Sequence, residues 1–272
     1  MDSDYTLAYG THTTPDEGRC AMEWVSHLAG EPHSDSPACV SSVLRAYCTS
    51  LNDSLEHEPR QLLRPYLART IGTADDGLDE ARSWMALDWL IRTYAPTWLA
   101  GAGLTVQAHQ LTELAPVMDA SDLQVALAAL KGARRDVRAT WASALGPARP
   151  AAWTSWAAGR AAAREAAWGL AGAAAWAAAR IEVGEIAGDR ARAVARDIGG
   201  DAAATIARGA RATAGRAAAK EAARRALAPT LAALQRSAFA LLDGMLPMVP
   251  LGAATDGAAD VPGSERLTAT RP

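Results

Sequence analysis

Cysteine is scarce in this sequence, with three residues in 272. So few cysteines exclude a small scaffold held together by disulfides, and an odd number cannot all pair within one chain. The opening stretch, MDSDYTLAYGTHTT, is polar and lacks the apolar core of a signal peptide. We therefore expect a reducing, cytoplasmic location.

Long apolar runs are also missing. The longest uncharged apolar run is Ala166 to Ala179, fourteen residues that are mostly alanine. A membrane-spanning helix needs about 20 residues of stronger hydrophobicity. The sequence therefore predicts no membrane span.

Lysine is nearly absent, and the positive charge comes almost entirely from arginine. Residues 1–150 carry 12 basic and 19 acidic residues, a net charge of −7, whereas residues 151–228 carry 12 and 7, a net charge of +5. A basic helical segment can lie along phosphates. Interspersed acidic residues and a pI near 6.0 argue against nucleic acid as a partner.

Strand patterns, glycine-rich phosphate loops and a Ser/His/Asp arrangement are all lacking, while apolar residues recur at helical spacing. We predict an all-α fold with four parts. These are a mobile leader (1–18), a helical bundle (19–147), an Ala-rich helical arm with a closing amphipathic helix (148–246), and a disordered tail (247–272).

Glycine and proline set the expected helix ends. Within the bundle we expect helices at 20–28, 37–54, 58–70, 78–94, 105–118 and 122–145, with Pro65 splitting the third and Ala95-Pro96 ending the fourth. In residues 151–228, 34 of 78 residues are alanine, the best helix former. There we expect long helices at about 150–198, with a possible interruption at Gly184 or Gly188, and at 201–228. Gly199-Gly200 would separate these two helices, and Pro229 would open the closing helix.

Groups capable of chemistry cluster between Cys20 and Cys39. The candidate site residues are Cys20, Glu23, Glu31, His33, Asp35 and Cys39. Cys20, Glu23 and His27 share one face of the first helix. Ser36 and Pro37 favour the start of a second helix, which would place Cys39 in its first turn and lower the pKa of its thiol.

Four interpretations of this segment remain open. The cysteines are small buried residues of the core; or Cys20, Glu23, His33 and Cys39 bind a metal, zinc or iron by ligand type. Alternatively, Cys39 is a reactive thiol activated by His33 or by the helix terminus, or the cysteines form a disulfide. The ligand spacing matches no standard structural zinc pattern.

Three motifs resemble a family of uncharacterised actinobacterial and actinophage proteins. They are C-x-M-E-x-V-S-x-x-A-G-E-P-H-S-D-x-P-x-C (Cys20 to Cys39), L-D-W-L-I-R-x-Y-A-P (Leu87 to Pro96) and L-A-P-T-L-x-x-L-Q-x-S-A-x-x-L-L-D (Leu227 to Asp243). The resemblance covers most of the chain in outline and implies no particular activity. It centres the first signature on Cys20, Glu23, Glu31, Asp35 and Cys39.

Two functional hypotheses follow. The first is a helical interaction or scaffold protein that acts through self-association or partner binding of its Ala-rich arm, with a homo-oligomer or a protein partner expected. Such an arm buries little apolar area per residue, so it has to pack on the N-terminal half, its own partner helix or a second subunit. The second is a metal-dependent or thiol-based enzyme or sensor with its site between Cys20 and Cys39.

Overall fold

The computed structural model describes residues 5–143, 150–179, 185–211 and 218–246. Within these ranges every regular element is helical, which confirms the all-α prediction. The α-helices are α1 (Ala21–Leu28), α2 (Ser42–Ser54), α3 (His57–Gln61), α4 (Arg64–Leu67), α5 (Asp79–Trp89), α6 (Ala95–Gly101), α7 (Thr105–Thr112), α8 (Ala120–Ser143), α9 (Pro150–Ala178), α10 (Glu185–Arg211) and α11 (Ala218–Met245). Two 3-10 turns, η1 (Pro15–Glu17) and η2 (Ala68–Thr70), and one π-helical turn, η3 (Leu90–Tyr94), complete the described elements. The predicted tail, 247–272, lies outside the described residues.

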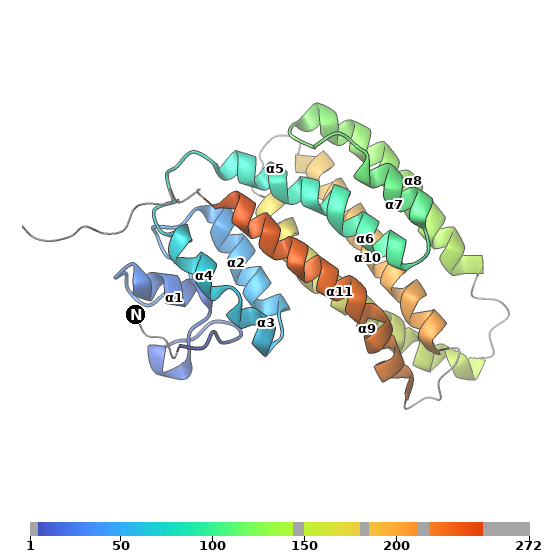
Figure 1. Ribbon diagram of the computed structural model, residues 1–272, viewed down its shortest axis with the longest axis horizontal. Helices are drawn as coiled ribbons and strands as arrows, with labels where there is room; N and C mark the ends of the chain where they lie inside the picture. The colour runs from blue at the N-terminus through green and yellow to red at the C-terminus, as the bar shows by residue number, and fades with distance from the viewer. Residues whose placement is uncertain (1–4, 144–149, 180–184, 212–217, 247–272) are drawn as a thin grey trace, which may run out of the picture.

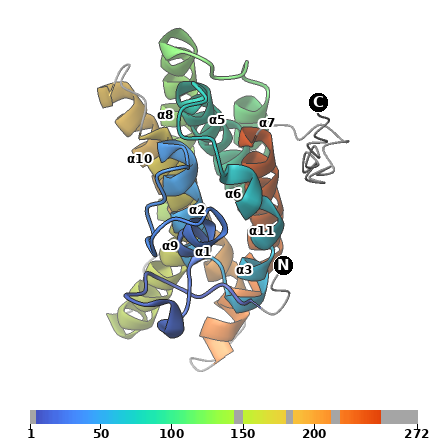
Figure 2. The same ribbon diagram turned by 90° about the vertical axis from the view of Figure 1, so that its left-hand side faces the viewer.

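The long helices pack side by side, and α1 to α4 gather at one end of the bundle (Figure 1). Helix α10 contacts α6, α8, α9 and α11, and α9 contacts α2, α5, α10 and α11. The Ala-rich helices therefore pack on N-terminal elements of the same chain. Figure 2 shows α9 and α2 close together in the perpendicular view. None of the described helices is long and apolar enough to cross a membrane.

Alanine makes this close packing possible. Ala167, Ala171 and Ala174 of α9 and Ala195 and Ala202 of α10 are almost completely buried. Each small side chain buries little area, at about 25 cal/mol per Å². The two helices therefore depend on many such contacts and on larger residues supplied by α2, α5 and η3.

The helix predicted to end at Ala95-Pro96 instead continues through the proline. Helices α5 and α6 form one rod joined by the π-helical turn η3. A proline inside a helix clashes with the carbonyl four residues earlier, and a wider turn relieves that clash. The Thr97 hydroxyl also donates to the Thr93 carbonyl oxygen at 2.6 Å.

The break predicted at Gly199-Gly200 is wrong, because α10 runs through both glycines. Their role lies in packing. A Cβ atom on Gly199 would lie 2.1 Å from the Tyr94 hydroxyl oxygen. Tyr94 is fully buried, and its hydroxyl donates to the Ala167 carbonyl oxygen of α9 at 2.9 Å. Because Gly199 has no side chain, η3, α9 and α10 can pack against one another.

Pro229 was expected to open the last helix, and this is also wrong, since it lies inside α11. Its neighbours Leu227 and Leu234 are buried, whereas Pro229 itself faces solvent. The carbonyl that loses its N–H partner therefore remains near water, and burial of the apolar face offsets the cost. As predicted, this helix closes the core.

The end of α11 is held by two contacts far apart in sequence. Arg82 is 1% exposed, and its Nε donates to the Met245 carbonyl oxygen at 2.9 Å. Its guanidinium also donates to Asp76 at 2.8 and 2.5 Å. Tyr47 donates to the Ala238 carbonyl oxygen at 2.9 Å. These bonds fasten the closing helix to α2 and α5.

The remaining helix boundaries follow the sequence in part. The split near Pro65 is confirmed by separate helices α3 and α4. Helix α7 ends at Thr112, earlier than predicted. Helix α9 ends at Ala178, so an unbroken helix over 150–198 is wrong, and the alternative interruption at Gly188 is also wrong because Gly188 lies inside α10. The predicted end of α8 at Leu145 and the interruption at Gly184 fall outside the described residues.

Candidate functional site

The N-terminal cap of α1 brings Cys20 and Glu23 together. Cys20 occupies the cap position, and its N–H donates to Glu23 Oε2 at 2.8 Å. A carboxylate in the first turn also faces the positive end of the helix. Both residues are 1% exposed, so the polar contact lies inside the protein.

His12 completes the surroundings of the Glu23 carboxylate. Its N–H donates to Glu23 Oε1 at 2.6 Å, and its Nδ1 lies 2.8 Å from Glu23 Oε2. Gly18 permits this placement, because a Cβ atom there would lie 3.1 Å from His12 Nε2. Sequence reasoning missed His12, since it lies in the segment expected to be a mobile leader and belongs to no periodic pattern.

Burial and hydrogen bonding shift the pKa of the Glu23 carboxyl group in opposite directions. Burial raises the pKa of Glu23, but the N–H groups of His12 and Cys20 and the His12 ring outweigh it and hold the pKa below its ordinary value. Burial raises the pKa of the Cys20 thiol to about 12, despite bonds from nearby N–H groups. At neutral pH, Glu23 is therefore ionised and Cys20 is a neutral thiol.

Other residues of the N-terminal segment pack on the same region. The ring of Tyr5 stacks on Trp24 of α1 with centroids 3.7 Å apart. Leu7 is fully buried, and its N–H donates to Gln61 Oε1 at 2.8 Å. These contacts join residues 5–18 to α1 and α3, and they were not expected for a mobile leader.

The loop after α1 is tied down by its own polar side chains. Glu31 accepts hydrogen bonds from the N–H groups of Ala38 at 2.7 Å and Cys39 at 2.9 Å. His33 Nε2 lies 3.0 Å from the His12 carbonyl oxygen, and the Ser26 hydroxyl donates to the carbonyl oxygen of Ser34. The Cys39 thiol and these N–H groups lower the pKa of Glu31.

The prediction for Cys39 is wrong in two respects. The second helix begins at Ser42 with Ser41 as its cap, so Cys39 lies in the preceding turn and not in a helical first turn. The Ser41 hydroxyl accepts from the Leu44 N–H, which is the bond that Ser36 was expected to make. Burial and the Glu31 carboxylate raise the pKa of the Cys39 thiol instead of lowering it.

The predicted site residues thus fall into two groups. Cys20 and Glu23 meet, with His33 Nε2 4.0 Å from Glu23 Oε1, while Glu31 meets Cys39. Asp35 is exposed. All three cysteines are free thiols, so the disulfide does not form.

No metal-binding arrangement is found in the part of the chain that the structure describes, since no three His, Cys, Asp or Glu side chains there are placed to hold an ion. The Glu23 and Glu31 carboxylates are occupied by N–H donors. The zinc or iron site stays a prediction that this geometry does not favour. The polar groups between Cys20 and Cys39 mainly hold neighbouring parts of the chain together.

A second feature lies on α9, where one side of the helix is left uncovered. We call it the α9 face and define it as Glu165, Trp168, Gly172, Trp176 and Ala179. Trp176 is 64% exposed and Trp168 43% exposed. Sequence reasoning placed tryptophans in the Ala-rich segment but had no means of telling which sides of α9 other helices cover.

Comparisons of the chain with models of known protein families, with curated proteins and with solved structures found no match. The resemblance to actinobacterial and actinophage proteins therefore stays a prediction.

Proposed function

We propose that this protein is a helical interaction protein that binds another protein through the α9 face. The observation that carries the proposal is the exposure of Trp176 on the stretch of α9 over residues 163–178, whose other sides are largely buried. Tryptophan is enriched at the centre of protein interfaces, where its large ring supplies much of the binding free energy.

The α9 face is long enough to serve as a docking surface. Trp168 and Trp176 are eight residues apart, which corresponds to about 12 Å along a helix. Between Glu165 and the end of α9 the sequence has no charged residue. A partner that covers the part of this face beyond Glu165 would therefore remove apolar surface from water without removing water from a charged side chain of α9.

Trp168 is held in place before any partner arrives. Its Nε1 donates to the Arg196 carbonyl oxygen of α10 at 3.1 Å. The Arg164 guanidinium carbon lies 5.6 Å from the centroid of the indole ring. Fixed aromatic side chains lose little conformational entropy on binding, which favours their use as anchors.

The Cys20 to Cys39 segment gives less support to an enzyme or sensor. Both thiols have raised pKa values, so neither is a ready nucleophile. The Glu23 and Glu31 carboxylates already accept backbone N–H groups. These observations favour a structural role for the segment and an interaction role for the protein.

A photo-crosslinking experiment tests the proposal. A benzoylphenylalanine residue replaces Trp176 in the full chain, and the matched control replaces Val106, which is 64% exposed on α7. After illumination in an extract of the cells that contain the protein, the first variant should form a protein adduct that the control does not form. If position 176 gives no more adduct than position 106, the α9 face is not a docking surface.

A further inference from the structure

We infer that the side of α8 that faces α10 is a second docking surface, and that it binds an acidic segment of another protein. We call this surface the α8–α10 seam and define it by its charged residues, which are Lys131, Arg134, Arg135 and Arg138 of α8 and Arg190, Asp197 and Asp201 of α10. Five basic and two acidic side chains give the seam a net charge of +3, although the whole chain carries −3. The inference goes beyond the α9 face and does not depend on it.

The charged residues of α8 are separated onto two sides of the helix. Arg134 and Arg138 both donate to Asp197 of α10, Arg138 through Nη2 at 3.4 Å. Asp136 lies on the other side, where it accepts a hydrogen bond from Gln107 Nε2 of α7 at 3.0 Å. The side of α8 toward α10 is therefore basic, and the side toward α7 carries negative charge.

Ion pairs within the fold neutralise only part of the positive charge. Asp201 is 1% exposed, and it accepts from Arg138 Nε at 3.5 Å and from Arg164 Nη2 of α9 at 3.1 Å. Together with Arg134, three arginines therefore share the carboxylates of Asp197 and Asp201. One positive charge remains in excess at the centre of the seam.

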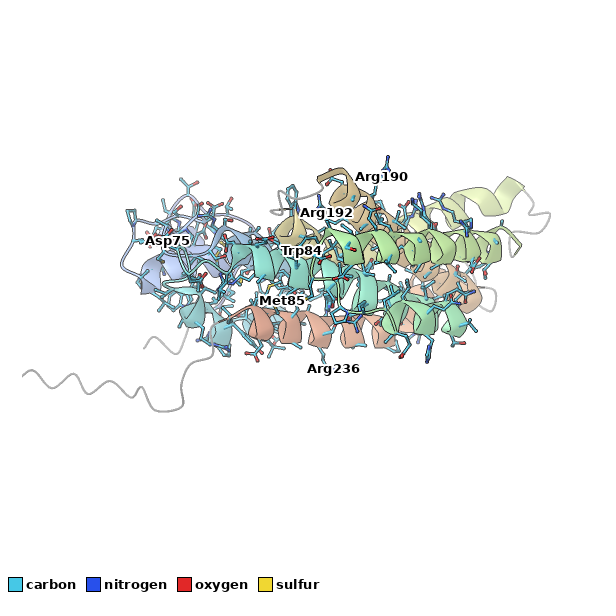
Figure 3. All side chains as sticks on the ribbon, turned by 90° about the horizontal axis from the view of Figure 1, so that it is seen from above. Asp75, Trp84, Met85, Arg190, Arg192 and Arg236 are labelled. Atoms are coloured by element: carbon cyan, nitrogen blue, oxygen red, sulfur yellow. The ribbon has the colours of Figure 1, made fainter. Side chains whose placement is uncertain are left out.

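Three further cations of the seam extend into solvent. Lys131, Arg135 and Arg190 are exposed, and none of them forms an ion pair with another residue that the structure describes. Lys131 lies four residues before Arg135 and seven before Arg138, so the three follow one side of α8. Arg190 precedes Asp197 by two helical turns and extends outward from α10 (Figure 3). These side chains are open to a negatively charged ligand.

The Asp197 carboxylate favours one kind of acidic partner over another. Its side chain is 27% exposed and lies between Arg134 and Arg138. A nucleic-acid strand carries a negative charge at every phosphate, so a strand along the seam would meet this carboxylate with a like charge.

A protein segment can place an uncharged residue opposite Asp197 and its carboxylates elsewhere. Lys131 and Arg135 lie about 6 Å apart along the axis of α8. Acidic residues four positions apart on a partner helix have the same spacing and share one face. The seam therefore fits an acidic helix better than a nucleic acid.

Fluorescence anisotropy with two labelled peptides and the full chain tests this inference. One peptide is an Ala-rich helix of about 20 residues with Glu at every fourth position, and the other has Gln at the same positions. At low ionic strength, the Glu peptide should bind at least about tenfold more tightly than the Gln peptide. Added salt should weaken its binding, because the contacts are exposed ion pairs.

Charge reversal locates the binding site. Lys131→Glu combined with Arg135→Glu should raise the dissociation constant of the Glu peptide at least about tenfold, and Arg190→Glu should raise it about threefold. The matched control, Arg236→Glu, changes the net charge as much as Arg190→Glu does, but at an exposed position of α11 on the opposite edge of the bundle in Figure 3. It should leave the dissociation constant unchanged. Circular dichroism should show the same helix content in all variants.

Equal affinity for the Glu and Gln peptides, or equal losses in Arg190→Glu and Arg236→Glu, would overturn the inference. A single-stranded oligonucleotide that binds more tightly than the Glu peptide, and that Lys131→Glu with Arg135→Glu releases, would also overturn it and assign the seam to nucleic acid. Crosslinking at position 176 tests the α9 face separately, so failure of the seam leaves the proposed function standing, and the reverse.

Discussion

Replacing Glu23 should be among the most damaging single changes outside the apolar core. Glu23→Ala leaves three donors without an acceptor: the N–H groups of His12 and Cys20 and the His12 ring nitrogen. Each buried unpaired donor costs ~1–3 kcal/mol, and partial access to water reduces the total. We expect the free energy of unfolding to fall by about 3–5 kcal/mol.

The conservative variant separates charge from shape. Glu23→Gln keeps one oxygen acceptor but loses the ionised group, and charge-assisted bonds are roughly twice as strong as neutral ones. We expect a loss of about 1–2 kcal/mol. Glu31→Gln is the matched control, because Glu31 also accepts two backbone N–H groups but lies nearer solvent, and its loss should be smaller.

The pKa of Glu23 determines how the free energy of unfolding changes with pH. The folded pKa of Glu23 lies below its ordinary value. Its stabilisation is therefore fully present above the ordinary glutamate pKa of roughly 4.3 and is lost as the pH falls through the folded pKa. Below pH 4.3, the unmodified protein should lose more unfolding free energy than Glu23→Gln.

Urea unfolding followed by circular dichroism measures all of these quantities. The stabilising role of the Glu23 contacts is refuted if the free energy of unfolding of Glu23→Ala at pH 7 lies within about 1 kcal/mol of that of the unmodified protein. Such a difference is less than one buried unpaired donor should cost.

Three further predictions concern packing and reactivity. Gly199→Ala should cost about 3 kcal/mol by urea unfolding, because its Cβ would lie 2.1 Å from the Tyr94 hydroxyl, whereas Gly200→Ala meets only side-chain atoms at 3.0 Å or more and should cost under about 1 kcal/mol. Equal losses would contradict the packing role of Gly199. Arg82→Met should cost about 3 kcal/mol in the same assay, because it removes a buried cation and the bond that holds the end of α11; an unchanged midpoint would show that this bond contributes nothing. Cys20 should resist Ellman's reagent at pH 8 until the protein unfolds, since its thiol has a pKa of about 12, and rapid modification of the folded protein would contradict that environment.

The sequence predicted the existence of most helices but not where several of them end. Alanine content and helical spacing predicted helical structure over most of residues 150–246, because helix propensity and amphipathicity are local properties, but the predicted divisions are not those between α9, α10 and α11. Gly199, Pro96 and Pro229 misled the prediction, since local rules treat them as breaks. The structure uses Gly199 for contact with Tyr94 and absorbs Pro96 in a π-helical turn, and neither can be read from local sequence.

The candidate site was predictable only where its members are close in sequence. Cys20 and Glu23 were placed together through helical spacing, and a capping arrangement brings them into contact. His12 lies on a segment that folds back over α1, and its contact with Glu23 depends on the packing of Tyr5 and Leu7. The local signals for Cys39 were misleading, because Ser36-Pro37 has the composition of a helix start but forms part of a loop held by Glu31.

The most direct test of the central claim is hydroxyl-radical footprinting of Trp176, read by mass spectrometry in the purified protein and again in native extract. We expect rapid oxidation of Trp176 in the purified protein and a steep fall in its rate in the extract, where a partner covers the α9 face. Tyr9, which is 66% exposed on the N-terminal segment, should be oxidised at a constant rate and serves as the control. If Trp176 is oxidised at the same rate, relative to Tyr9, with and without native extract, the α9 face is not a binding surface and the proposed function is wrong.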